Sequence, residues 1–290
     1  MTPATTTTPT LTDHPTTGPT PRAPWVAHFG FAKTPFTKRI AARDLMARTA
    51  HAEAIARIGF CIAEAALGVV CGEVGAGKTV AVRAATAALD RTRYQVIYIP
   101  NPTIGTRGLY VAIVAALGGS PRFHKAEVMR QAADLLAAEE HERRRRVVVC
   151  IDEAHLLSPE QLEELRLLTN TDMDAQSPFA GILLGQPTLA RKLRLGVSAA
   201  LDQRIATRYT IAPMDLGESA AYLAHHLQLA GRTEPLFADD ATARLHRVAG
   251  GLPRKLNNAA TAALIAAAAD GKPLVDDTCA KRAAAELTRD

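Results

Sequence analysis

The stretch CGEVGAGKT at residues 71–79 decides the fold, because it fits the phosphate-loop pattern G-x-x-x-x-G-K-[ST]. The apolar run LGVV precedes it and the alanine-rich segment VAVRAATAAL follows it, so a strand enters the loop and a helix leaves it. Glycine at positions 72, 75 and 77 lets the backbone aim its N–H groups at phosphate oxygens, which a Cβ atom would obstruct. The sequence therefore predicts a binding site for a nucleoside triphosphate such as ATP.

Two side chains of the loop have separate tasks in this interpretation. Lys78 would bridge the β- and γ-phosphates as a point charge, and the hydroxyl of Thr79 would complete the ligand shell of a Mg²⁺ ion. The nucleotide contacts are expected from the whole loop and the first helical turn, namely Gly72, Glu73, Val74, Gly75, Ala76, Gly77, Lys78, Thr79 and Val80.

The second chemical motif is VVVCIDEAH at residues 147–155. Four β-forming residues carry Asp152 to the carboxyl edge of a sheet, where its carboxylate can hold Mg²⁺ through water. Glu153, the next residue, would polarise the attacking water as general base. His155 is expected to be a packing residue rather than a catalyst. Since no zinc-type spacing and no G-x-S-x-G elbow occurs, Mg²⁺ is the only metal ion implied.

Composition sets further bounds. With 290 residues, 48% hydrophobic and 22% charged, the chain can form one large domain and a smaller one. The apolar stretches fall short of the roughly 18 residues that a membrane span needs, so no membrane partner is expected. The segment 1–27 is rich in Thr and Pro without a signal-type apolar core, which predicts a disordered tail and a cytoplasmic protein.

The order of elements predicts an α/β fold with a parallel five-stranded sheet covered by helices on both faces. Strand patterns alternate with helical ones as far as residue 212, and only helical patterns follow. We therefore expect an ATPase core at 28–212, with an N-terminal linker, and a small helical lid domain at 213–290. The five predicted strands are LGVVC at 67–71, YQVIYIP at 94–100, VVVCID at 147–152, FAGILLG at 179–185 and TRYTI at 207–211.

The charge balance is compatible with a nucleic-acid partner. The net charge is +5 and the sequence pI is about 9.2, which permits and mildly favours binding to a polyanion. The arginine run at 143–146 has a simpler explanation, because cations at a helix end complement the helix dipole. That explanation is favoured over a DNA-binding patch.

These motifs, in this order, resemble the AAA+ ATPases, and more narrowly the ExeA/TnsC/TniB group of bacterial ATPases. The resemblance extends from residue 28 to the end of the chain. It depends on the motifs HFGFAKTPF, HAEAIARI, GEVGAGKT, IDEAHLLSPEQLEELRLLTN, LLGQPTL, LDQRIATRYTI and GGLPRKLNN.

The resemblance implies further site residues. Gln186 would be the sensor that orients the water or the γ-phosphate, although many AAA+ proteins place Asn there. Arg254 would be the lid arginine that contacts the γ-phosphate. Arg204 would be the arginine finger that reaches a neighbouring subunit's site, and Arg208 is an open alternative. A finger supplied in trans implies a homo-oligomer, a ring or a filament.

Two more groups of residues are singled out. Phe36, with Phe29 and Phe31, would either pack beside the adenine or fasten the N-terminal arm to the core, and both interpretations stay open. Arg107, Arg122 and Lys125 lie in loops on the side where members of the resembled group approach DNA. Their contacts would be directed to the DNA backbone and sensitive to salt.

The resemblance implies an ATP-dependent, DNA-binding regulator of transposition that oligomerises on duplex DNA and recruits or activates a DDE-type transposase. The alternatives are an ExeA-like secretion-system assembly ATPase and an ATPase similar to helicase loaders. The ExeA branch adds a membrane helix and a periplasmic wall-binding domain, and the sequence shows neither after the predicted lid, which favours transposition.

Overall fold

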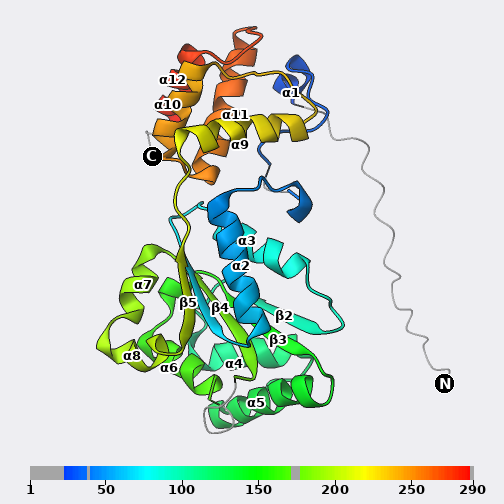
Figure 1. The fold of residues 1–290 in the computed structure, drawn as a ribbon, viewed down its shortest axis with the longest axis vertical. Coiled ribbons are helices and arrows are strands. Elements are labelled where there is room, and N and C mark those ends of the chain that lie inside the picture. Colours follow the sequence, from blue (N-terminus) through cyan, green and yellow to red (C-terminus); the bar gives the residue numbers. More distant parts are fainter. Residues whose placement is uncertain (1–22, 38–39, 171–176, 288–290) are drawn as a thin grey trace, which may run out of the picture.

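A computed structural model describes residues 23–37, 40–170 and 177–287 of the chain. It shows an α/β core and a group of helices stacked on one end of that core (Figure 1). The expected tail at 1–27 lies almost entirely outside the described residues.

The core is built on five strands, all parallel to their neighbours, in the order β2-β3-β4-β1-β5. This confirms the predicted α/β fold with its parallel five-stranded sheet. The inner strands consist almost wholly of buried apolar residues, as is typical of a sheet covered on both faces. The strands are β1 (Leu67–Cys71), β2 (Tyr94–Ile99), β3 (Arg146–Ile151), β4 (Phe179–Gly185) and β5 (Ile205–Thr210).

Side chains alternate between the two faces of the sheet, and each face has its own hydrophobic cluster. Val70 and Val148 point into the cluster under α2 (Thr49–Ala63) and α3 (Lys78–Ala87). Val69 and Val149 point into the opposite cluster. The helices of that second face are α4 (Gly105–Ala116), α5 (Lys125–His141), α6 (Pro159–Leu168), α7 (Pro187–Leu193) and α8 (Ala199–Asp202).

The lid has a separate core made largely of alanine and leucine side chains. Its first helix begins with a capping box, in which the Asp215 side chain accepts from the Glu218 N–H and the Glu218 side chain accepts from the Asp215 N–H. The lid helices are α9 (Leu216–Leu229), α10 (Asp239–Ala249), α11 (Pro253–Ala269) and α12 (Asp277–Leu287).

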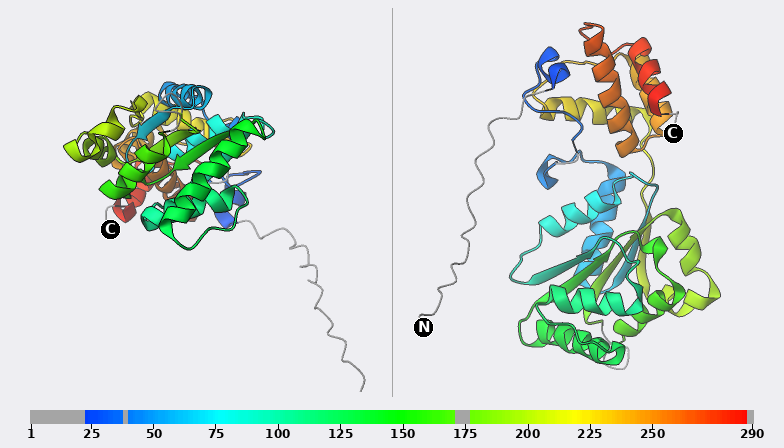
Figure 2. Two further views of the ribbon diagram at one scale, coloured as in Figure 1. Left: turned by 90° about the horizontal axis from the view of Figure 1, so that it is seen from below. Right: turned by 180° about the vertical axis from the view of Figure 1, so that it is seen from behind.

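The N-terminal arm packs with the lid. The short helix α1 (Pro24–His28) contacts α11, and Phe29, Phe31 and Phe36 are buried in the hydrophobic cluster of the lid. Both views show this segment beside the lid helices (Figure 1, Figure 2). Residues 40–48 therefore lead into the core, and the chain returns to the lid after β5.

Among the described residues, no helix combines the length and apolar character needed to cross a lipid bilayer.

Candidate nucleotide site

The phosphate loop joins β1 to α3 and has the backbone that its glycines allow. Gly75 and Gly77 have φ angles of +85° and +96°, a region that side chains with a Cβ atom rarely adopt. A Cβ atom on Gly77 would lie 2.4 Å from Nε2 of His51, so a larger residue there would also have to displace the His51 ring. The helix α3 begins at Lys78 and directs its positive end toward the loop.

Lys78 is buried and lies along the loop. Its Nζ donates hydrogen bonds to the carbonyl oxygens of Gly72 (2.9 Å) and Glu73 (3.1 Å). Burial lowers the pKa of Lys78, while the carboxylates of Glu153 and Asp152 oppose that shift. An anion that arrives at this loop therefore meets a poorly hydrated ammonium group, which strengthens their attraction.

Two oxygen atoms that could bind a metal ion, from Thr79 and Asp152, meet between the loop and the acidic motif. Oδ2 of Asp152 accepts hydrogen bonds from the Thr79 hydroxyl (2.8 Å) and from the Tyr98 hydroxyl (2.7 Å). A hydroxyl and a carboxylate from neighbouring elements fit Mg²⁺, which prefers hard oxygen ligands and completes its shell with phosphate oxygens and water. Thr79 and Asp152 are the residues that would hold this ion.

Tyr98 was not predicted from the sequence. Burial and the hydrogen bond to Asp152 raise the pKa of Tyr98 far above its usual range, so the phenol remains a donor. Its position next to Asp152 follows from the register, because Tyr98 in β2 pairs with Cys150 in β3. That pairing could not be known before the strand order.

Glu153 has an unusual backbone. Its φ angle is +51°, in the left-handed region that non-glycine residues enter at a cost of roughly 1 kcal/mol or more. The conformation places the Glu153 N–H within 2.9 Å of Oδ1 of Asp152. It starts the short helix η2 (Ala154–Leu156) directly after the strand.

Glu153, His155 and Gln186 form a continuous polar contact. Nδ1 of His155 lies 3.4 Å from Oε2 of Glu153, and its Nε2 lies 3.1 Å from Nε2 of Gln186. The structure thus brings the predicted base and the predicted sensor together through His155, which the sequence analysis treats as a packing residue.

The lid contributes Arg254. The helix α11 begins at Pro253, and the N–H of Arg254 donates to the carbonyl oxygen of Gly75 (3.3 Å). A Cβ atom on Gly75 would lie 2.6 Å from Cβ of Arg254. The lid helix therefore begins in direct contact with the phosphate loop.

A cavity of about 600 Å³ extends from the phosphate loop between the core, the lid and the N-terminal arm. One end is lined by Lys78, Thr79, Asp152, Glu153 and Arg254, and the other end is mostly apolar. The apolar end could accept a flat base. Of the other lining residues, the sequence predicts Phe36 but not Leu45, Met46, Arg48, His51, Ile55, Tyr222 or His226.

Aromatic rings form part of this apolar end. The ring of Phe36 stacks on His226 with centroids 5.3 Å apart and an angle of 27°, while Tyr222 lies 4.4 Å from His226. Burial, with a smaller effect of His225, lowers the pKa of His226 to about 4. Phe29 and Phe31 do not line the cavity. Phe36 thus both lines the cavity and fastens the arm to the lid.

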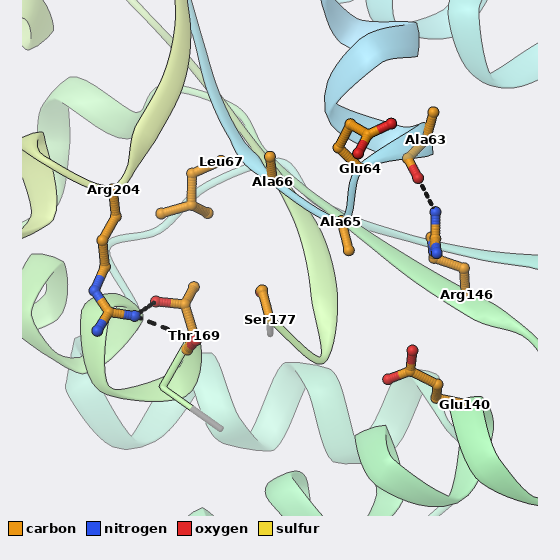
Figure 3. A pocket seen from close by; sticks show the side chains of 10 residues that line it. All are labelled: Ala63, Glu64, Ala65, Ala66, Leu67, Glu140, Arg146, Thr169, Ser177 and Arg204. Atoms are coloured by element: carbon orange, nitrogen blue, oxygen red, sulfur yellow. Dashed lines mark hydrogen bonds between the residues drawn. The ribbon is translucent and has the colours of Figure 1, made fainter. Parts of the chain in front are cut away.

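Arg204 lies away from the phosphate loop of the same chain, whereas Arg208 lies within β5, opposite Val69 of β1. Arg204 precedes β5, and the loop follows β1, so the two lie at opposite edges of the parallel sheet. Nη1 of Arg204 donates to Oγ1 (3.0 Å) and the carbonyl oxygen (3.3 Å) of Thr169, beside a second cavity (Figure 3). Arg208 pairs with Asp202 at 2.8 Å.

Of the three residues predicted to contact DNA from loops, only Arg122 lies in a loop, between α4 and α5, whereas Arg107 lies in the first turn of α4 and Lys125 begins α5. Arg107 donates to the carbonyl oxygens of Phe123 (2.9 Å) and Arg122 (2.8 Å). Lys125 pairs with Glu164, which also accepts from the buried hydroxyl of Tyr110. The positive charge of Lys125 is therefore partly neutralised within the molecule.

The arginine run at 143–146 has structural partners. Arg143 and Arg145 both pair with Glu139, which is fully buried, and Arg146 donates to carbonyl oxygens at the end of α2. These contacts favour the structural explanation of the run over a DNA-binding patch.

Comparison with known proteins agrees with this geometry. Residues 62–193 match the family model described as "AAA domain". The chain is 35% identical over 252 residues to general secretion pathway protein A of Aeromonas hydrophila, a match that covers 84% of this chain. It spans 45% of that relative's length, so less than half of the relative is represented in this chain.

Solved structures show the same fold at low sequence identity. Cdc6p of Pyrobaculum aerophilum matches with a TM-score of 0.69 at 15% identity, over 87% of this chain and 70% of that one. ORC1 of Aeropyrum pernix, solved in complex with DNA, matches with a TM-score of 0.64 at 16% identity, over 93% of this chain and 70% of that one. The RuvB branch-migration motor of Thermotoga maritima matches with a TM-score of 0.54 at 17% identity, over 82% of this chain and 70% of that one. The matched model, the strand order and the phosphate loop together identify the core around residues 62–193 as an AAA-type P-loop ATPase domain.

Proposed function

We propose that this chain hydrolyses ATP with Glu153 as general base and uses the reaction to control a homo-oligomer on duplex DNA. The observation that carries the proposal is that one cavity, between core and lid, is lined by a phosphate loop, two carboxylates and a lid arginine. Together these groups can bind a triphosphate, activate water and report the loss of the γ-phosphate.

Each side chain has a specific task in the reaction. The phosphate oxygens would replace the loop carbonyls as partners of Lys78, and loop N–H groups would hold the β-phosphate. Mg²⁺, held by Thr79 and Asp152, would neutralise charge on the β- and γ-oxygens. Glu153 would take the proton of the attacking water, and Gln186 would orient that water.

The lid supplies the output of the cycle. Arg254 would bind the γ-phosphate while its backbone holds Gly75 of the loop, so the loss of phosphate removes one of the two links that Arg254 makes to the nucleotide site. The other catalytic cation would be Arg204, at the opposite sheet edge from the loop of its own chain, or Arg208, which lies within β5 and pairs with Asp202. It would act in a neighbouring copy, which makes a ring or filament the active form.

The finer task that we propose is regulation of DNA transposition, with a DDE-type transposase as partner. The support is the motif resemblance, the net charge of +5 and the basic cluster of Arg107, Arg122 and Lys125. ORC1, which shares the fold, was solved with DNA bound. Contacts from the basic cluster would be made to phosphates and would weaken steeply with salt.

A second candidate is an assembly ATPase of a secretion pathway. The specific observation that favours it is the 35% identity to general secretion pathway protein A over 252 residues. In that case the oligomer would act on a protein or envelope partner, and DNA would have no effect on turnover.

One experiment separates the two candidates. ATP turnover is measured with and without duplex DNA at low and moderate salt, and the Glu153→Gln variant with ATP is imaged on duplex by electron microscopy. Stimulation that falls with salt, together with filaments on DNA, supports the first candidate. Equal turnover with and without DNA contradicts it and favours the second. Arg107→Ala should reduce the stimulation, while Arg282→Ala, an exposed lid arginine, is the matched control.

A further inference from the structure

His155 occupies a fixed place between two functional side chains that come from different elements. Glu153 ends the β3 segment, and Gln186 immediately precedes α7. The backbone of His155 is held from both sides. Nζ of Lys192 donates to its carbonyl oxygen (3.0 Å), and a Cβ atom on Gly185 would lie only 3.2 Å from its nitrogen. The fold therefore sets the position of the ring, independently of any ligand.

The contact with Gln186 restricts where the imidazole carries its proton. The two Nε2 atoms are 3.1 Å apart, and an amide nitrogen can only donate, so Nε2 of the imidazole must accept. The proton of the neutral ring then lies on Nδ1. The reverse amide orientation would place the Nδ1 lone pair 3.4 Å from the Glu153 carboxylate, two acceptors facing each other. Of the two neutral tautomers, only the Nδ1–H form satisfies both neighbours.

Nδ1 is a buried donor that waits for an acceptor. It makes no hydrogen bond among the described residues, although Oε2 of Glu153 is 3.4 Å away. A buried donor without an acceptor is unfavourable, so a small rotation of the Glu153 side chain toward it is favoured. The Glu153 side chain is 44% exposed and has room to turn.

We propose that His155 is a positioning residue that couples Gln186 to Glu153, an inference that rests on the proposed roles of those two residues. Nδ1–H holds Oε2 of Glu153, which leaves Oε1 to take the proton of water. Nε2 engages the amide nitrogen of Gln186, which leaves its carbonyl oxygen to accept a hydrogen bond from the same water. One imidazole thus fixes both groups that must meet the attacking water.

The two ends of the ring can be tested separately. In His155→Asn, the amide nitrogen can replace Nδ1 beside Glu153, while the contact with Gln186 is lost. In His155→Gln, the longer side chain can reach Gln186 but leaves no donor beside Glu153. His155→Phe removes both contacts and keeps a flat ring. The matched control is His141→Phe, which changes an exposed histidine at the end of α5.

The measurements are steady-state ATP turnover and the equilibrium affinity for a fluorescent ATP analogue. We expect His155→Phe to lower kcat roughly 10- to 100-fold, below the ~10²–10⁴-fold that a general base supplies, with analogue affinity unchanged within about twofold. His155→Asn should recover most of the loss, and His155→Gln less. In the His155→Phe background, Gln186→Ala should cost little more, because the coupling is already broken.

The opposite results overturn the proposal. Wild-type kcat in His155→Phe would show that the ring only packs. If His155→Asn and His155→Gln lose both turnover and nucleotide affinity as strongly as His155→Phe does, the role of His155 is structural. Should His155→Phe not fold, the kcat values of His155→Asn and His155→Gln are compared instead. A higher kcat for His155→Gln than for His155→Asn contradicts the proposal. Loss of turnover in Glu153→Gln with normal turnover in His155→Phe leaves the proposed function intact and refutes this inference alone.

Discussion

The ion pair between Arg48 and Glu218 joins the core to the lid, and its two side chains differ in their exposure to solvent. Nη2 of Arg48 lies 3.2 Å from Oε2 of Glu218 and 3.3 Å from the carbonyl oxygen of Ala212. The Arg48 side chain is 2% exposed and the Glu218 side chain is 32% exposed. Removal of Glu218 strands a buried cation, whereas removal of Arg48 leaves a carboxylate that reaches water and still caps α9.

The magnitudes follow from this asymmetry. Loss of one partner of a fully buried pair costs about 3–5 kcal/mol, and the partial exposure of Glu218 reduces that figure. We therefore expect Glu218→Gln, which can keep the cap, to lower the free energy of unfolding of the lid by about 2–3 kcal/mol. Arg48→Met fills the space of the aliphatic stem and should cost about 1 kcal/mol.

Trp25, the single tryptophan, packs against the lid cluster and reports its unfolding. Urea titration followed by tryptophan fluorescence gives the stability of the lid, and far-ultraviolet circular dichroism follows the whole chain. Asp270→Asn, which breaks an exposed ion pair within the lid, is the control and should change stability by less than about 1 kcal/mol. A larger cost for Arg48→Met than for Glu218→Gln would refute the reasoning.

The remaining predictions concern the nucleotide and pH. Lys78→Ala should lose most nucleotide affinity in a binding titration, and intact binding would mean that the loop is misinterpreted. Glu153→Gln should bind ATP normally but lose at least about 100-fold in turnover, and retained turnover would exclude it as the base. Gly75→Ala should weaken ATP binding because its Cβ meets Arg254, whereas Gly118→Ala, with a similar φ of +83° and open space, should not. The pKa of His226 is lowered to about 4 in the folded protein, so as the pH falls this histidine is protonated in the unfolded chain before it is protonated in the folded one. Stability should fall by up to about 3 kcal/mol between pH 6.5 and 4, and less in His226→Phe.

The core could be predicted from the sequence because its signals are local. The phosphate loop at 71–79 needs a strand before it and a helix after it, and VVVCID can only be a buried strand that ends in acids. Alternation of such segments then requires a parallel sheet. The structure has a strand at each of the five predicted places.

The apolar end of the cavity could not be predicted, because it is assembled from segments that are remote in sequence. Leu45 and Met46 come from the arm, Tyr222 and His226 from α9, and Phe36 from a segment that packs with the lid. Each of these residues lies in an ordinary apolar or helical pattern. Their meeting depends on how the lid sits on the core, for which no local pattern exists.

Charge patterns in the sequence were equally incomplete. Internal carboxylates neutralise several of the basic residues that the sequence makes conspicuous. Buried Glu139 pairs with two arginines of the run 143–146, and Glu164 pairs with Lys125. A basic residue can contact DNA fully only if no internal anion already neutralises it. Arg107 and Arg122 therefore carry more of the proposed DNA contact than Lys125.

The position of the cavity couples nucleotide binding to the lid. Its lining comes from the arm, the core and the lid, so a ligand that touches all three stabilises the docked lid and not the separated one. By linkage, the factor by which bound nucleotide favours the docked lid equals the factor by which the docked lid favours nucleotide, so a contact that raises the docked fraction raises the apparent affinity. The pair of Arg48 with Glu218 and the contact of Arg254 with Gly75 are two such contacts, and Arg48, Gly75 and Arg254 all line the cavity. Variants that weaken the first should therefore bind ATP less tightly, although Arg48 and Glu218 have no part in the proposed chemistry.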